Sequence, residues 1–178
     1  MTEKTPKTAI VLIPPESVWQ PIQGIRRVHD RQFRRWMPHV TLAYPFLPAE
    51  QFDAAATRAA DACRAFEPFE IQLARFGHFR HDTGSCTIWL APEPPDPIIR
   101  LQSALREAFP GCDDVNRFPS GFTPHLSMGQ ADEKEVADLL AELQKGWRPV
   151  RFAVEAVCLI WRNEPPDDVF RVGRFCAL

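Results

Sequence analysis

The sequence predicts an α+β fold of two similar lobes, with two antiparallel sheets around a central cleft and helices packed on the outer faces. Two observations predict this fold. Strand-like and helix-like segments follow the order strand, helix, strand, helix, strand, and this order occurs twice. A short motif, Pro-His followed by an apolar and a hydroxyl residue, stands on the middle strand of each occurrence. An internal duplication of this kind predicts two lobes related by a pseudo-twofold axis.

The chain is long enough for one domain with a sizeable core, so we expect residues 1–178 to form a single domain. Its repeat halves run roughly from 9 to 79 and from 86 to 176. With 45% hydrophobic and 25% charged residues, the composition is that of an ordinary globular protein. The net charge of −2 provides no global attraction for nucleic acid. Any recognition of a polyanion must therefore come from a local patch.

Targeting signals and cysteine usage point to a cytoplasmic protein. No apolar run approaches the roughly 20 residues that cross a bilayer, and residues 1–7 lack the apolar core of a signal peptide. The five cysteines are odd in number, scattered and without a Cys-x-x-Cys pair, so we expect reduced, buried side chains. We expect a monomer without membrane association and without an obligate protein partner.

The first repeat begins with an apolar run at 8–13, closed by two prolines, which predicts a buried strand. A helix is expected from Ser17, with Gln20 completing a capping box. Its inward stripe is predicted to be Trp19, Ile22, Ile25 and Val28. After the first motif strand, Pro48 suits the first turn of an Ala-rich helix. The buried face of that helix is predicted to be Phe52, Ala55, Ala56, Ala59, Cys63 and Phe66.

A basic cluster precedes the first motif. Its members are Arg26, Arg27, Arg31, Arg34 and Arg35. A solvated helix end is one explanation, since exposed arginine is the norm. A phosphate-attracting rim beside a site is the other.

The middle of the chain predicts a hairpin of two strands, 69–79 and 86–90, with a turn at 82–85. His78 and His81 lie near its tip with Cys86 close by, but their spacing matches no standard zinc pattern. A solvent-facing hairpin explains them more simply than a metal site does.

The second repeat predicts a helix that starts at Asp96-Pro97 and ends before Pro110-Gly111. The following loop carries Asp113 and Asp114, which are expected to be solvated rather than catalytic. After the second motif strand, Asp132 and Glu135 predict another capping box. Two strands close the chain, at 151–161 and 169–176, joined by a Pro-Pro-Asp-Asp turn as in an antiparallel hairpin.

The two motifs carry the predicted chemistry. They are His39-Val40-Thr41-Leu42 and His125-Leu126-Ser127-Met128. Side chains alternate faces along a strand, so each histidine shares a face with its hydroxyl residue while the apolar residues point to the core. Two imidazoles across a cleft suit in-line displacement at phosphorus, one as base and one as acid. The hydroxyls of Thr41 and Ser127 would donate hydrogen bonds to phosphate oxygens.

Rival chemistries fit less well. The sequence has no Gly-x-Ser-x-Gly elbow, no His-Glu-x-x-His segment and no Gly-rich phosphate loop. His39 and His125 alone would lack a third protein ligand for a metal. We therefore expect neither a metal nor another cofactor.

The paired motifs resemble the signature of the two-histidine (2H) phosphoesterase superfamily, and the resemblance covers nearly the whole chain, including the Phe122-Thr123-Pro124 lead into the second motif. It is closest to the 2'-5' RNA ligase or RNA 2',3'-cyclic phosphodiesterase branch. The resemblance implies metal-independent opening of a 2',3'-cyclic phosphate on an RNA end or a small nucleotide. His39 and His125 would be acid and base, and Thr41 and Ser127 would bind phosphate. Whether 2'-5' RNA ligation also occurs is left open.

One departure concerns the substrate. Many relatives in the RNA-processing branch carry a basic residue shortly after the second motif, where this chain has Gly129-Gln130. This position therefore lacks the basic side chain that those relatives would offer to a long RNA.

Residues around the cleft are predicted to bind substrate. The candidates for a base-stacking wall are Tyr44, Phe46, Phe122 and Trp161, with Arg162 as a phosphate contact. Core packing is the alternative for each aromatic residue. Tyr44, the only tyrosine, is the best candidate because it lies just beyond the motif strand.

Two functions of different classes remain. The first is a phosphodiesterase, and the second is a non-catalytic nucleotide- or RNA-binding module on the same fold. The presence of all four motif residues favours the enzyme, because a module freed from chemistry would be expected to lose at least one.

Overall fold

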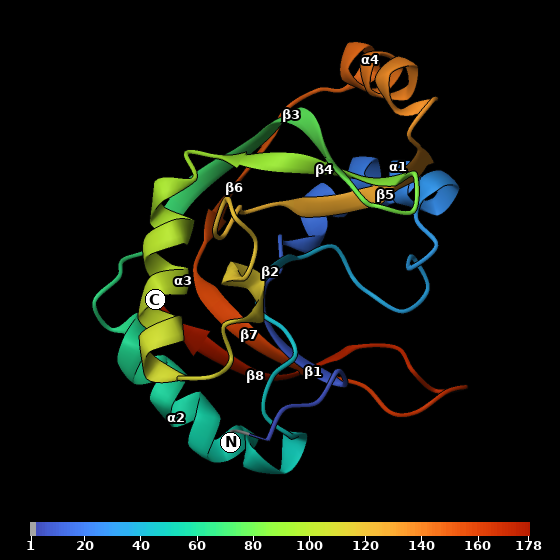
Figure 1. The fold of residues 1–178 in the computed structure, drawn as a ribbon. Coiled ribbons are helices and arrows are strands. Elements are labelled where there is room, and N and C mark those ends of the chain that lie inside the picture. Colours follow the sequence, from blue (N-terminus) through green and yellow to red (C-terminus); the bar gives the residue numbers. More distant parts are fainter. Residues whose placement is uncertain (1–2) are drawn as a thin grey trace.

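The computed structural model describes residues 3–178, and its eight strands form one curved antiparallel sheet (Figure 1). The strand order is β6-β3-β4-β5-β2-β1-β7-β8. The strands are β1 Thr8–Leu12, β2 Val40–Ala43, β3 Phe69–Arg80, β4 Ser85–Glu93, β5 Leu126–Asp132, β6 Val150–Val154, β7 Ala156–Trp161 and β8 Arg171–Ala177. The predicted antiparallel α+β fold is confirmed. The two expected sheets are the four-stranded halves of one continuous sheet rather than separate sheets.

The two halves join where the motif strands β5 and β2 pair, at Val40 and Leu126. On each side of this join the order is a motif strand, the first strand of a repeat, the last strand of a repeat and an edge strand. These are β5, β4, β3 and β6 on one side and β2, β1, β7 and β8 on the other. Each half of the sheet takes strands from both halves of the chain. This symmetric order is what an internal duplication would produce, and it puts the two motifs at the centre.

Within the described residues 3–178, four α-helices and three short 3-10 helices accompany the sheet. They are η1 Glu16–Val18, α1 Trp19–His29, η2 Ala49–Gln51, α2 Phe52–Cys63, α3 Asp96–Ala108, η3 Asp114–Asn116 and α4 Val136–Gly146. Helix α2 packs against β8 and α3, whereas α1 packs against β5 and α4 against β3 (Figure 1). No helix within residues 3–178 combines the length and the apolar character that a bilayer crossing requires.

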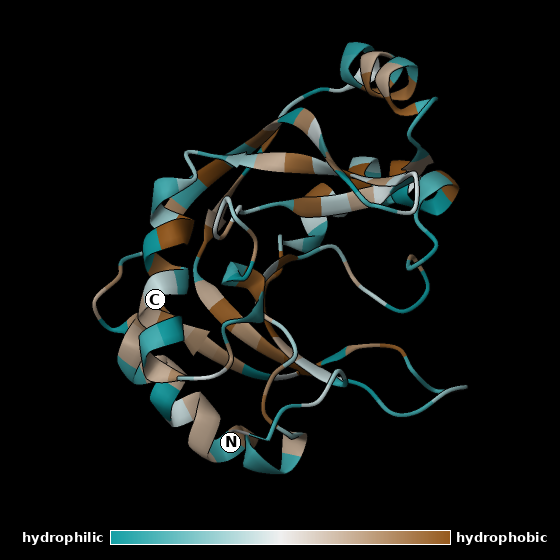
Figure 2. Ribbon diagram, viewed as in Figure 1, coloured by the Kyte–Doolittle hydropathy of each residue, from teal (hydrophilic) through white to brown (hydrophobic). Residues whose placement is uncertain are grey.

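Strand β1 is buried on both faces, which explains its unbroken apolar run. Ile10 and Leu12 point into the larger core cluster, and Ala9 and Val11 point into a smaller cluster on the other side. The smaller cluster also contains Phe170. Many residues of the strands are apolar, whereas hydrophilic residues are frequent along the helices and loops (Figure 2). Burial on both faces fixes β1 and so fixes its neighbour β2, which carries the first motif.

Several predicted details of the helices are wrong. Helix α1 starts at Trp19 without a side-chain cap, so the Ser17–Gln20 box does not form. Its inward stripe includes Arg26, which is 2% exposed, while Val28 is 74% exposed. The second capping box is also absent at the start of α4, because no side chain caps that helix.

The predicted strand at 151–161 is two strands. β6 pairs with β3 at one edge of the sheet, and β7 pairs with β1 in the other half. The turn after β7 does form the predicted antiparallel hairpin with β8. All five cysteines are free and buried, as predicted.

Candidate active site

The two motifs lie side by side because β2 and β5 pair at their first residues. Val40 and Leu126 are opposite each other and are buried at 2% and 0% exposure. Side chains alternate along a strand, so His39, Thr41, His125 and Ser127 share the other face. Antiparallel pairing then sets His39 opposite Ser127 and Thr41 opposite His125. The four motif residues are therefore brought together in one patch.

Both histidines are held by the backbone in the same way. The Nδ1 of His39 lies 2.7 Å from the carbonyl oxygen of Met37, and the Nδ1 of His125 lies 2.8 Å from that of Thr123. A carbonyl oxygen only accepts a hydrogen bond, so Nδ1 carries a proton in each ring. In the neutral ring Nε2 is then the basic nitrogen. A buried proline, Pro38 or Pro124, separates each histidine from the residue whose carbonyl anchors it, and restricts that residue to extended backbone.

Each imidazole also contacts an aromatic ring. The ring of Trp36 stacks on His39 with centroids 4.6 Å apart and planes inclined by 19°. Phe79 meets His125 edge-on at 4.8 Å and 88°. Neither ring is predicted from the sequence to contact a histidine. A signal for Trp36 was present, because it stands three residues before His39 as Phe122 stands three before His125. Phe79 gave no such signal, since it comes from a distant strand.

Burial makes both imidazoles poor bases in the free protein. Desolvation lowers the pKa of His39 to about 4, and the positive charges of Arg26 and of a protonated His125 act in the same direction. Desolvation also lowers the pKa of His125, against the opposing effect of the Thr123 carbonyl. A bound anion would favour the protonated rings and raise both pKa values. Binding of an anion would therefore favour protonation of His39 or His125.

A cavity of about 390 Å³ opens beside His125 and Thr41. Its walls are formed by Thr41, His78, Phe79, Arg80, His81, Val115, Phe118, Pro119, Ser120, Gly121, Phe122, Thr123 and His125. The end of β3 contributes His78, Phe79 and Arg80 to the lining, and the loop before the second motif contributes Phe118 and Phe122. Such a volume suits a small-molecule ligand, with aromatic surface for binding and a few polar groups for orientation.

The predicted substrate-binding residues divide into three groups. Phe122 lines the cavity. Phe46 is 0% exposed and packs on Phe109 at 5.0 Å, so it is a core residue and not part of a stacking wall. The other three, Tyr44, Trp161 and Arg162, lie outside the cavity lining.

Tyr44 and Arg162 belong to the surroundings of Trp36. Tyr44 meets the Trp36 ring edge-on at 5.5 Å and donates its hydroxyl to the Pro6 carbonyl at 3.3 Å. The Arg162 guanidinium lies 4.9 Å from the ring of Phe170, which packs on Trp36 at 3.8 Å. Trp161 is half-buried, with the guanidinium of Arg171 at 5.7 Å from its ring.

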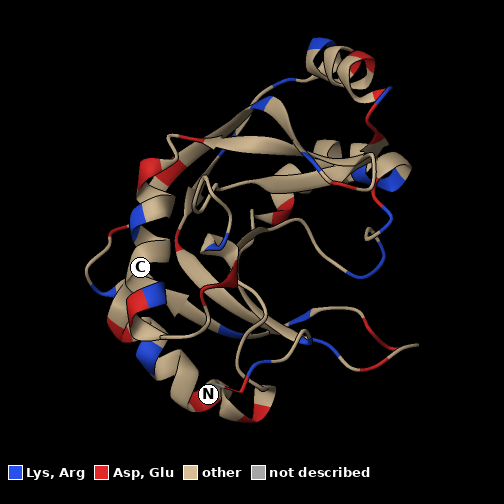
Figure 3. Cartoon of the chain, viewed as in Figure 1, with Lys and Arg blue, Asp and Glu red and all other residues tan. Residues whose placement is uncertain are grey.

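The basic cluster does not act as one surface. Arg26 is buried and paired with Asp30, and Arg34 and Arg35 both reach the buried Asp168. Charged residues of both signs are spread over the molecule (Figure 3). Only Arg27 and Arg31 of the five are exposed without an ion pair among the described residues. The expected rim is therefore reduced to these two side chains.

The considered metal site at the hairpin is not assembled. Cys86 is fully buried, and the Nε2 of His81 lies 2.8 Å from the Thr87 hydroxyl. Across residues 3–178, no three His, Cys, Asp or Glu side chains gather as a metal-ligand group. His78 instead lines the cavity.

The chain is similar in sequence to one family of known proteins and to named bacterial proteins. Residues 14–166 match the model of the family described as the 2'-5' RNA ligase superfamily. A protein of Geobacillus kaustophilus named "Putative phosphoesterase" is 28% identical over 141 residues, which are 78% of each chain. An Oceanobacillus iheyensis protein of the same name is 26% identical over 140 residues, 78% of this chain and 79% of that one.

Solved structures share the fold. Escherichia coli LigT in complex with 3'-AMP superposes with a TM-score of 0.67 at 20% identity, covering 97% of each chain. Usb1 of Kluyveromyces marxianus gives a TM-score of 0.55 at 14% identity, covering 98% of this chain and 99% of that one. Curved sheets of this kind thus recur at low sequence identity.

Proposed function

The chain belongs to the 2'-5' RNA ligase superfamily of two-histidine phosphoesterases, and we propose that it is a metal-independent phosphodiesterase that opens 2',3'-cyclic phosphates. The substrate would be an RNA end or a small nucleotide. The observation that carries the proposal is the matched pair of histidines. Each is anchored through Nδ1 to the carbonyl two residues before it, on one face of two adjacent strands.

The two imidazoles supply the proton transfers. In an in-line displacement, one neutral Nε2 takes a proton from the attacking water, while the other ring, protonated, gives its proton to the departing ribose oxygen. The anionic cyclic phosphate stabilises the protonated ring and so offsets the desolvation that lowers the pKa of both histidines. Thr41 and Ser127 donate hydrogen bonds to the non-bridging phosphate oxygens, where negative charge grows in the transition state.

The cavity beside His125 takes the nucleoside. Phe79, Phe118 and Phe122 provide rings on which a base can stack, which is a sequence-tolerant mode of recognition. The structure of E. coli LigT with 3'-AMP supports a nucleoside phosphate as ligand for this fold. Tyr44 and Arg162 lie on the side of His39. There the Tyr44 ring and the Arg162 guanidinium would contact the remainder of a longer RNA.

The test is turnover of a 2',3'-cyclic mononucleotide in the presence of excess EDTA, with a binding assay alongside. The proposal expects hydrolysis that survives exhaustive chelation, because the four motif residues supply proton transfer and hydrogen bonds themselves. Binding without turnover would make the protein a nucleotide-binding module. Loss of turnover in EDTA that zinc or manganese restores would refute the metal-free mechanism.

A further inference from the structure

A buried ion pair lies next to the first motif. Arg26 on α1 donates through Nε to Oδ2 of Asp30 at 2.9 Å, and Nη2 lies 2.8 Å from the same oxygen. Both side chains are 2% exposed. Arg26 also donates through Nη1 to Gln23 at 2.9 Å and through Nη2 to the carbonyl of Trp36 at 2.9 Å. Burying a guanidinium is costly, and these contacts engage all three of its nitrogen atoms.

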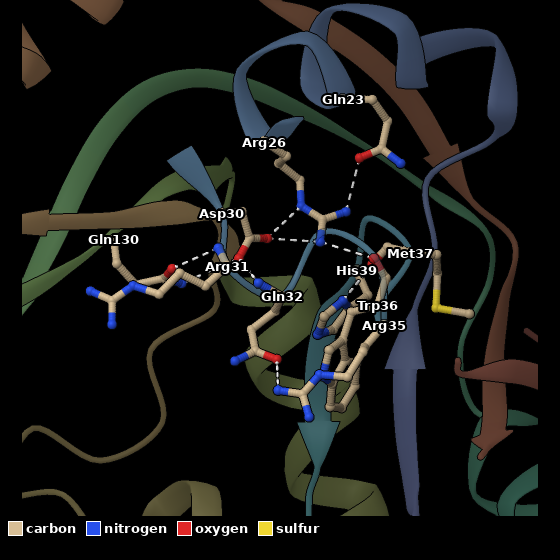
Figure 4. Close-up of polar contacts among 10 residues, drawn as sticks. All are labelled: Gln23, Arg26, Asp30, Arg31, Gln32, Arg35, Trp36, Met37, His39 and Gln130. Carbon is tan, nitrogen blue, oxygen red and sulfur yellow. Dashed lines mark hydrogen bonds and ion pairs between the residues drawn. The ribbon is translucent and has the colours of Figure 1, made fainter. Parts of the chain in front are cut away.

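The pair holds both ends of the loop that leads into the first motif (Figure 4). At the start of the loop, Oδ1 of Asp30 accepts the backbone N–H of Gln32 at 2.9 Å. At its end, Arg26 holds the carbonyl of Trp36, the residue whose ring stacks on His39. The next carbonyl, that of Met37, accepts the Nδ1 proton of His39. The ion pair thus fixes the backbone behind the two contacts that orient His39. These contacts are the stacked ring of Trp36 and the hydrogen bond to the Met37 carbonyl.

The same pair is tied to the strand of the second motif. Gln130 on β5 donates through Nε2 to Oδ1 of Asp30 at 3.2 Å, and its Oε1 accepts the N–H of Arg31 at 3.0 Å. Gly129 permits this approach, because a Cβ at its φ of +154° would lie 2.5 Å from the carbonyl oxygen of His29. Gly129-Gln130 is the place where the family resemblance leads one to expect a basic residue.

We propose that Arg26, Asp30 and Gln130 are positioning residues, which hold the ring of His39 in register with the second motif strand. This inference rests on the proposed function. None of the three contacts substrate in this account. Arg26 and Asp30 fix the loop carrying Trp36 and Met37, and Gln130 fixes that loop to the strand that begins just after His125.

Gln130→Leu, with Gln144→Leu as the matched control, is the first test. Gln144 also joins a helix to a strand with two hydrogen bonds, since its Oε1 accepts Phe76 N–H at 3.0 Å and its Nε2 donates to the Ala74 carbonyl at 2.9 Å. It belongs to α4, and both of its partners are backbone groups of β3, which carries neither motif. We expect Gln130→Leu to lower kcat about 10- to 100-fold with little change in KM, since small misplacements of a reacting group have such effects. Gln144→Leu should leave kcat unchanged.

Arg26→Lys is the second test, because lysine keeps the charge but cannot make the forked contacts to Asp30, Gln23 and the Trp36 carbonyl together. The readout is the proton NMR signal of the His39 ring, which stacking on Trp36 shifts by its ring current. In Arg26→Lys and in Gln130→Leu this shift should shrink, while the signals of His125 stay in place.

The NMR readout needs no catalysis, so it separates the two proposals. If the wild type hydrolyses no cyclic phosphate, the proposed function fails, and the His39 signal still decides whether these residues hold the ring. If Arg26→Lys does not fold, Gln130→Leu carries the test. An unchanged His39 signal together with wild-type kcat in Gln130→Leu would overturn the inference.

Discussion

The imidazole of His39 lies flat against the indole of Trp36, with ring centroids 4.6 Å apart. His125 has no equivalent stacked partner among residues 3–178, since Phe79 meets it edge-on and the ring of Trp89, 6.1 Å away, is tilted by 57°. The indole keeps water from one face of His39, and desolvation is the main cause of the pKa of about 4.

Replacing the indole should make His39 more basic. In Trp36→Leu, water reaches the imidazole, so its pKa should rise from about 4 toward the ordinary value of about 6.5. NMR titration of the ring protons measures this directly, with His125 as the internal control. A pKa of His39 that stays near 4 in the variant would assign the desolvation to other neighbours.

The stability of the wild type should depend on the protonation of His39. Its pKa is about 4 in the folded state and about 6.5 in the unfolded chain, so between these values the unfolded state binds more protons. The part of the free energy of unfolding that depends on a neutral His39 is fully present above pH 6.5 and is lost as the pH falls toward 4. It amounts to about 3 kcal/mol. Urea unfolding of wild type and His39→Gln at several pH values measures this contribution as the difference between the two proteins. If the free energy of unfolding depended on pH in the same way in both, the prediction would be wrong.

The two hydroxyls should matter less than the two imidazoles. Thr41→Ala or Ser127→Ala removes one hydrogen-bond donor to the phosphate, and we expect kcat to fall on the order of 10- to 1000-fold. Steady-state kinetics on a cyclic mononucleotide measures the loss. If Ser127→Ala alone abolished turnover and the wild type showed a covalent burst, Ser127 would be a nucleophile and the proposed mechanism wrong.

The exposed Arg27, near the end of α1, and Arg31, just after that helix, are proposed to attract longer RNA. Arg31→Glu should weaken binding of an oligonucleotide that ends in a cyclic phosphate and flatten its salt dependence, because fewer counterions are released. Turnover of a cyclic mononucleotide should barely change. Arg64→Glu, at the end of α2, is the control for net charge. If the two variants bound the oligonucleotide with equal affinity, Arg31 would be an ordinary solvated residue without a role in RNA binding.

The central strands and the motif residues were predictable because they depend on local patterns. The apolar run of β1 and the repeated Pro-His motif are visible in any reading of the sequence. The division between β6 and β7 was not, because residues 151–161 read as a continuous strand and only the distant partners β3 and β1 separate them. Strand pairing between distant segments is decided by the whole fold and not by local preference.

The surroundings of the histidines were predictable only in part. Arg26 looked exposed because arginine usually is, and its burial depends on Asp30 and on a carbonyl ten residues along the chain. Phe46 is predicted from the sequence to line the cleft, yet it packs on Phe109 in the core. The cavity combines strand β3 with the loop before the second motif, segments that no sequence pattern connects.

The central claim is that His39 and His125 act as a pair in acid-base catalysis. The most direct test is the pH dependence of 2',3'-cyclic AMP hydrolysis by wild type, His39→Ala, His125→Ala and the double variant. For the wild type we predict a bell, because one ring must be neutral and the other protonated. In kcat/KM, which reports the free enzyme, its limbs should reflect the lowered pKa values of both rings, one near pH 4 and both below about 6.5. In kcat the bell should move to higher pH, since the bound anion favours the protonated rings.

Each single variant should lose several orders of magnitude and one limb of the bell, and the double variant should lose little more, because the two groups act as a unit. The limb that each variant lacks assigns the acid and the base. A wild-type profile that is flat from about pH 4 to 9, or near-normal turnover by His39→Ala, would show that these histidines are structural and would contradict the account.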